Sequence, residues 1–111
     1  MQYKIKSRIW IEVDDKMFLG EGRVKLLKAI ERTGSLSKAA KSIQISYNKA
    51  WKLIDSVNKA AKELVVIKNT GGKGGGGAIV TAYGKNLISS FDTVNRNCWK
   101  FLDKQATKLT L

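Results

Sequence analysis

The sequence predicts a single domain, residues 1–111, that is mainly α-helical with two small β-hairpins, and three observations support this fold class. Apolar residues recur at helical spacing between residues 23 and 62, with two short breaks. A second, uninterrupted helical pattern fills residues 82–104. Between them, residues 64–81 form two short extended segments around a run of glycines. This order of elements is typical of a winged helix-turn-helix with an added N-terminal hairpin.

The first predicted element is a β-hairpin at residues 3–20. Apolar and polar side chains alternate from Tyr3 to Val13, which is the pattern of a strand with one buried face. A turn at Asp14 and a short apolar return strand follow. Trp10 interrupts the polar face of the first strand, and we expect it to cover the outer side of the hairpin.

Three helices are predicted between residues 23 and 62. The first should end at Gly34, because glycine tolerates the left-handed conformation that closes many helices. Ser35 and Ser46 are placed to cap the second and third helices, which a tight turn separates. Small alanines on both helices would allow them to cross closely at a steep angle, as a helix-turn-helix requires.

Residues 64–81 are predicted to form a second hairpin with a glycine-rich tip. Six of the ten glycines fall between Gly71 and Gly77, interrupted only by Lys73. Such a loop can press its backbone amides against a partner while the lysine adds charge. The spacing also matches the dinucleotide-binding pattern G-x-G-x-x-G, but no helix follows directly and no later strand is predicted, so that context is missing. A flexible linker is the remaining alternative.

A long helix is predicted at residues 82–104. At 1.5 Å per residue it would extend for about 35 Å, which is longer than the core of one small domain can cover. Its apolar residues follow the alternating four- and three-residue spacing of a coiled-coil seam. We therefore expect a second copy of the chain to pack against it, the alternative being a helix that lies along its own domain. The predicted dimer interface consists of Leu87, Phe91, Val94, Cys98 and Phe101.

The charge balance favours a polyanionic partner. Lys and Arg outnumber Asp and Glu by 21 to 9, which gives a formal net charge of +12, and such an excess attracts nucleic acid. No segment approaches the roughly 18 apolar residues of a membrane span, and no apolar signal core follows the basic N-terminus. We expect a cytoplasmic protein that binds double-stranded DNA and no membrane.

Residue types that carry common catalysis are scarce. The chain has no histidine, and its single cysteine, Cys98, has no partner for an internal disulfide. The usual zinc sites and histidine-based nucleophile relays are therefore absent. We expect no enzyme, no metal and no cofactor, and no small-molecule effector is evident.

The third predicted helix carries the best candidates for contact with DNA. Residues 35–62 hold six lysines and one acid, Asp55. In helix-turn-helix proteins the N-terminal turns of the second helix meet base edges, where Asn can pair with adenine. Asn48 is therefore the predicted base reader, and a merely solvated lysine face is the alternative. Trp51 either belongs to the core or stacks on the DNA backbone. The candidate DNA-binding residues are Ser35, Ser37, Lys38, Ser46, Tyr47, Asn48, Lys49, Lys52, Lys68, Thr70 and Lys73.

Four segments resemble one known family. They are residues 33–40 (TGSLSKAA), 45–51 (ISYNKAW), 70–78 (TGGKGGGGA) and 80–84 (VTAYG). With them, the run from Arg23 to Ile88 resembles the N-terminal DNA-binding domain of the ModE family of molybdate-dependent transcriptional regulators, itself similar to the LysR-type winged helix.

The resemblance implies a role for each matched segment. It places Ser46, Tyr47, Asn48 and Lys52 on a recognition helix, Lys73 on the wing, and the helix after Gly84 at a dimer interface. Nothing in these 111 residues resembles the family's molybdate-binding modules. The expected function is a dimeric, sequence-specific transcriptional regulator without those modules. The alternatives are a non-specific architectural nucleic-acid-binding protein and a winged helix that binds proteins.

Overall fold

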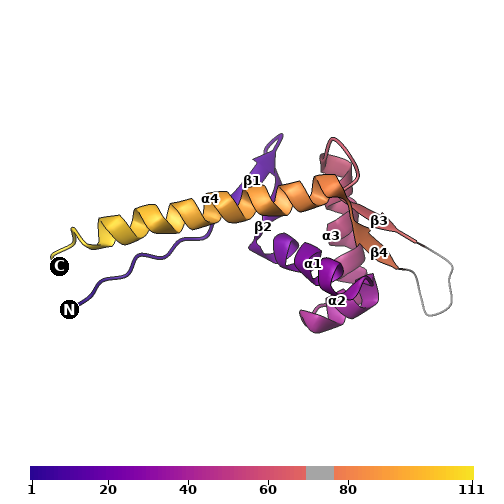
Figure 1. Cartoon of the computed structure of the whole chain (residues 1–111), viewed down its shortest axis with the longest axis horizontal. Coiled ribbons are helices and arrows are strands. Elements are labelled where there is room, and N and C mark those ends of the chain that lie inside the picture. The colour runs from indigo at the N-terminus through magenta and orange to yellow at the C-terminus, as the bar shows by residue number, and fades with distance from the viewer. Residues whose placement is uncertain (70–76) are drawn as a thin grey trace.

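The computed structural model describes residues 1–69 and 77–111, which form four helices and two small antiparallel sheets (Figure 1). This mainly helical architecture agrees with the predicted fold class. None of the helices in the described ranges is long and apolar enough to cross a membrane. The elements are β1 (Trp10–Val13), β2 (Lys16–Gly20), α1 (Glu21–Thr33), α2 (Leu36–Ser42), α3 (Tyr47–Ala60), β3 (Val66–Lys68), β4 (Ala78–Val80) and α4 (Ala82–Ala106).

The N-terminal hairpin is shorter than predicted. Strands β1 and β2 pair from Trp10 opposite Gly20 to the turn, where Asp14 and Asp15 have φ angles of 51° and 64°. Positive φ at both central residues is the geometry that closes two-residue hairpins. The prediction of a strand from residue 3 was wrong, because β2 has only five residues and offers no ladder partner further upstream.

Residues 1–9 instead run in extended form beside the second half of α4 (Figure 1). Their alternation persists, since Tyr3, Ile5 and Ile9 are half-buried. The Tyr3 hydroxyl donates to the carbonyl oxygen of Leu111, and Ser7 Oγ lies 3.6 Å from Cys98 Sγ.

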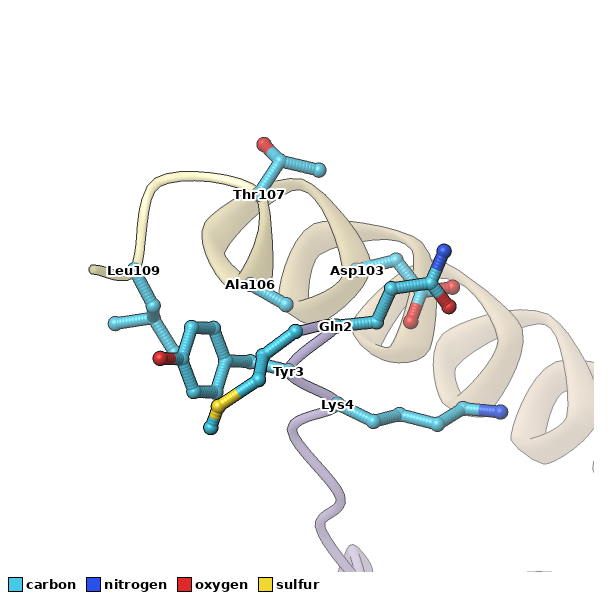
Figure 2. A pocket seen from close by; sticks show the side chains of 8 residues that line it. Gln2, Tyr3, Lys4, Asp103, Ala106, Thr107 and Leu109 are labelled. Atoms are coloured by element: carbon cyan, nitrogen blue, oxygen red, sulfur yellow. The ribbon is translucent and has the colours of Figure 1, made fainter. Parts of the chain in front are cut away.

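Between the two ends of the chain lies a hollow of about 580 Å³. In Figure 2 the Tyr3 ring lies beside Leu109, and Ala106 points toward the N-terminal segment. The N-terminal segment therefore covers one side of α4 where the rest of the domain no longer reaches it.

Helices α1, α2 and α3 begin and end at the predicted positions within two residues. Gly34 closes α1 with a φ of 68°, and its N–H donates to Ile30 O. Ser35 Oγ accepts from the Lys38 N–H at 3.2 Å and Ser46 Oγ from the Lys49 N–H at 3.0 Å, so both predicted serine caps are confirmed. The turn between α2 and α3 contains Gln44 with a φ of 62°.

The core lies between α1, α3, the β3–β4 hairpin and the first turns of α4. Leu26, Leu27 and Ile30 of α1 are fully buried at its centre. Helix α4 starts against this core at Gly84, where an added Cβ would lie 2.5 Å from Val65 O. No real Cβ tolerates that distance, so glycine is what lets α4 pack so closely against Val65, just before β3, and Val80 of β4.

Helix α4 makes the molecule elongated. Its 25 residues extend well beyond the rest of the domain (Figure 1). The extents are 60 × 28 × 22 Å and the radius of gyration is 16.7 Å, against about 13 Å for a compact chain of this length. The far half of α4 is therefore covered only in part by its own chain.

Candidate nucleic-acid interface

The exposed face of α3 is the centre of the candidate site. Tyr47, Asn48, Lys49 and Lys52 are all exposed, and they occupy the first turns of the helix. The opposite face is buried: Ala50, Ile54 and Val57 pack into the core. The fold thus presents Asn48, the predicted base reader, and three other candidate DNA-binding residues to solvent at the N-terminal end of one helix.

The serines at the helix starts serve first as caps. Ser35 and Ser46 each accept a backbone N–H through the hydroxyl oxygen, which leaves the hydroxyl hydrogen free to donate to an acceptor such as a phosphate oxygen. Ser37 and Lys38 are exposed on the first turn of α2. The starts of both helices therefore offer short hydrogen-bond donors next to lysine ammonium groups.

The lysines on this face keep their charge available. Among the residues that the structure describes, Lys38, Lys49 and Lys52 take part in no salt bridge, whereas Lys59 pairs with Asp55 at 3.0 Å. Exposed ion pairs of this kind contribute little to stability. The unpaired lysines produce a positive surface suited to a polyanion.

The base of the β3–β4 hairpin is fixed against the helices. Asn69 N–H donates to Gly77 O at 2.8 Å, and Ala78 N–H donates to Gly34 O at 3.0 Å, next to the start of α2. The predicted contacts Thr70 and Lys73, with the glycine-rich tip, lie outside the described residues. Lys68 lies on β3, before that tip.

The side chain of Lys68 packs against the ring of Trp51. The Lys68 Nζ lies 4.0 Å from the centroid of the Trp51 ring, a cation–π contact between the hairpin and α3. Trp51 remains 41% exposed, so it is neither a core residue nor fully open for stacking on DNA. The contact places the Lys68 charge beside the exposed face of α3.

Asn58 is a positioning residue that the sequence did not reveal. Its Oδ1 accepts from the Val65 and Val66 N–H groups at 2.8 and 3.1 Å, and its Nδ2 donates to Val66 O at 3.0 Å. This half-buried amide therefore holds the start of β3 on α3. The sequence could not predict this role, because the partners of Asn58 lie seven and eight residues further along the chain. An asparagine near the end of a helix matches no motif for such a contact.

Arg23 contributes to the scaffold rather than to the positive surface. Its Nη1 donates to Met17 O at 3.1 Å and to Ser56 Oγ at 3.2 Å, which links the β1–β2 hairpin to α3. Burial lowers the pKa of the Arg23 guanidinium below its usual value. In the described parts of the chain, no group of three His, Cys, Asp or Glu could hold a metal ion.

The predicted dimer seam on α4 divides into two faces. Phe91 is only 3% exposed and belongs to the domain's own core, whereas Val94 and Phe101 are 52% and 56% exposed. Leu87 and Cys98 are half-buried between these faces. The heptad-like spacing alone could not show which of these residues are buried and which are exposed, because residues three and four apart lie only roughly on one side of a helix.

Comparison with known proteins gives related transcriptional regulators, while no family model matches the chain. The chain is 44% identical over 82 residues to the transcriptional regulator ModE of Yersinia pestis. It is 43% identical over 82 residues to the DNA-binding transcriptional dual regulator ModE of Escherichia coli K12. It is 35% identical over 103 residues to the molybdenum transport protein ModE of Azotobacter vinelandii. These matches cover 74% to 93% of this chain but only 31% to 38% of the relatives, so the chain spans about a third of their length.

Proposed function

Because the chain is a homologue of the N-terminal region of the ModE transcriptional regulators, we propose that it is a sequence-specific DNA-binding regulator of transcription that acts in the cytoplasm. One observation carries the proposal. The predicted recognition residues Tyr47, Asn48, Lys49 and Lys52 share the exposed N-terminal part of α3, and its other face is buried. In our proposal this end of α3 enters the major groove of DNA.

Each part of the surface has its own task in this proposal. The Asn48 amide pairs with a base edge, because it can donate and accept toward adenine at once. Lys38, Lys49 and Lys52 contact phosphates, together with the hydroxyls of the capping serines. The β3–β4 hairpin acts as a glycine-rich wing, and Lys68 lies on it above Trp51. Lys73 at the tip would extend the phosphate contacts.

We also propose that α4 joins two copies of the chain. Val94 and Phe101 form an exposed apolar strip on the part of α4 that leaves the domain. Two copies packed along this strip would present two recognition helices to operator half-sites about one or two DNA turns apart. Two half-sites bound on one scaffold gain affinity through effective concentration.

The experiment compares two α3 variants on specific and random DNA. Binding sites are first selected by the wild-type chain from fragmented genomic DNA. We expect Asn48→Ala to cost about 1–3 kcal/mol of binding on a selected site and little on random DNA, as for a base contact. Lys52→Ala should weaken binding to selected and random DNA alike. It should also reduce by about one the slope of log affinity against log salt concentration. Asn86→Ala, an exposed asparagine on the first half of α4 and away from the Val94–Phe101 strip, is the matched control and should change neither.

Two outcomes would contradict the proposal. Equal losses for Asn48→Ala on both DNAs would remove its role as the base reader. Wild-type binding without any preference for selected sites would favour an architectural nucleic-acid-binding protein. Weak binding of the wild type to both selected and random DNA, in spite of the lysines on α3, would instead favour a winged helix that binds proteins.

A further inference from the structure

A pocket of about 460 Å³ lies where the β1–β2 hairpin, the start of α1 and the turn between α2 and α3 meet. Its volume is typical of small-molecule sites, which measure about 300–1,000 Å³. Apolar side chains form most of the lining, and they come from all of these segments. The apolar lining residues are Ile9, Trp10, Met17, Ile43, Ile45 and Leu53.

The charged residues around this pocket are mostly positive. Arg8, Arg23, Lys25 and Lys49 line it, and Glu21 is the single acid among the lining residues that the structure describes. Glu21 is already paired with Arg8 at 3.2 Å, and Arg23 is held by the hairpin carbonyls. Lys25 and Lys49 are exposed and have no salt bridge within the described ranges. Two free ammonium groups thus border an apolar surface.

We propose that this pocket binds a small organic anion with an aromatic or branched apolar body and one carboxylate. The apolar body matches the lining, and the carboxylate matches Lys25 and Lys49. A cation would meet repulsion from the surrounding charges, and a small inorganic oxyanion would leave the apolar surface unfilled. Two other hollows of similar size fit such a ligand less well, because one adjoins the chain ends and the other mixes aspartates with lysines.

The pocket shares a residue with the proposed DNA surface. Lys49 lies in the first turn of α3, and Ile43 and Ile45 flank the turn that positions this helix. A carboxylate on Lys49 would neutralise a charge that a DNA phosphate also needs. Binding of the anion and of DNA should therefore oppose each other by the same factor. This regulatory step rests on the proposed function, whereas the binding site itself does not.

Gly22 makes the site testable without disturbing the core. It lines the pocket, and a Cβ added there would meet nothing within 4 Å. A leucine at this position should therefore fill the pocket rather than strain the helix. Gly22→Ala is the matched control, because it changes the helix backbone in the same way but leaves most of the volume open.

The binding experiment uses indole-3-acetate, phenylpropionate and 4-methylvalerate as probes, each compared with its neutral amide. We expect at least one acid to shift the amide resonances of residues 20–25 and 43–49 saturably in ¹H–¹⁵N spectra. Its amide and the Lys25→Gln variant should each bind roughly tenfold more weakly, as expected for the loss of one charge-assisted hydrogen bond. Gly22→Leu should abolish the shifts, and Gly22→Ala should retain them.

The coupling experiment measures DNA affinity with and without the bound acid at constant ionic strength. The acid should weaken DNA binding of the wild type and of Gly22→Ala, but not of Gly22→Leu. The site is overturned if no acid binds at millimolar concentration, if the amides bind equally well, or if Gly22→Leu still binds. Absence of any DNA binding would refute the proposed function alone, since the spectra report the pocket independently.

Discussion

Helices α3 and α4 are both amphipathic, yet the chain covers them differently. In α3 the apolar residues Ile54 and Val57 are almost fully buried, and the exposed side carries lysines and polar side chains beside Tyr47 and Trp51. In α4 Phe91 is buried as well, but Val94 and Phe101 expose more than half of their side chains. A helix with one covered apolar face leaves a polar surface for a polyanion. A helix with a second, exposed apolar strip offers a surface suited to an apolar partner.

Substitution of the two phenylalanines of α4 tests this comparison with the largest expected effect. Phe91→Ala should cost about 3–5 kcal/mol of the free energy of unfolding, because it empties a core position. Phe101→Ala should cost under about 1 kcal/mol in the monomer, as for an exposed residue. Urea unfolding at low protein concentration measures both.

Phe101→Ala should act on assembly instead. Sedimentation should show that the wild type dimerises at tens of micromolar and that Phe101→Ala shifts this equilibrium toward the monomer. A folded wild-type monomer at that concentration would refute the dimer. Equal destabilisation by both substitutions would show that the chain covers α4 along its whole length.

The junction between the domain and α4 gives the second prediction. Gly84→Ala places a Cβ 2.5 Å from Val65 O and 2.8 Å from Val80 Cγ1, so we expect a loss of about 2–3 kcal/mol from overpacking. Gly22→Ala, the other helical glycine, has open space around it and should gain about 0.5–1 kcal/mol. Thermal or urea unfolding distinguishes the two signs. A neutral Gly84→Ala would mean that α4 can move away from Val65 and Val80 at little cost.

The turn before α3 gives the smallest expected effect. Gln44 has a φ of 62°, a conformation that costs most side chains about 1–2 kcal/mol. Gln44→Gly should therefore raise the free energy of unfolding, by about 0.5–1 kcal/mol after the greater flexibility of the unfolded chain is included. Affinity for selected DNA should stay unchanged, because the helix positions are kept. Loss of DNA binding without loss of stability would show that the glutamine side chain itself contacts the DNA.

Local signals predicted much of the fold and of the candidate site. Gly34, Ser35 and Ser46 mark helix ends through backbone geometry and hydrogen bonds within a few residues, so the sequence was sufficient. The same holds for the exposed placement of Asn48 and Lys52, which follows from the apolar stripe on the other face of α3.

The remaining features depend on what packs against each segment. Residues 3–9 alternate like a strand, but their segment runs beside α4 rather than beside a second strand (Figure 1). Phe91 and Phe101 belong to one apolar spacing, and only the three-dimensional fold buries the first alone. The pocket proposed to bind an organic anion could not be foreseen either, because separate segments of the chain each contribute part of its lining.

The position of the chain ends has a practical consequence. Residues 1–4 and the last turn of α4 lie together at one end of the 60 Å long axis, and α3 lies toward the other end (Figure 1). A dye, affinity tag or surface linker attached to either end would therefore stay remote from α3, the proposed recognition helix. Immobilised through such a handle, the protein could be assayed for DNA capture with its proposed binding face pointing away from the support.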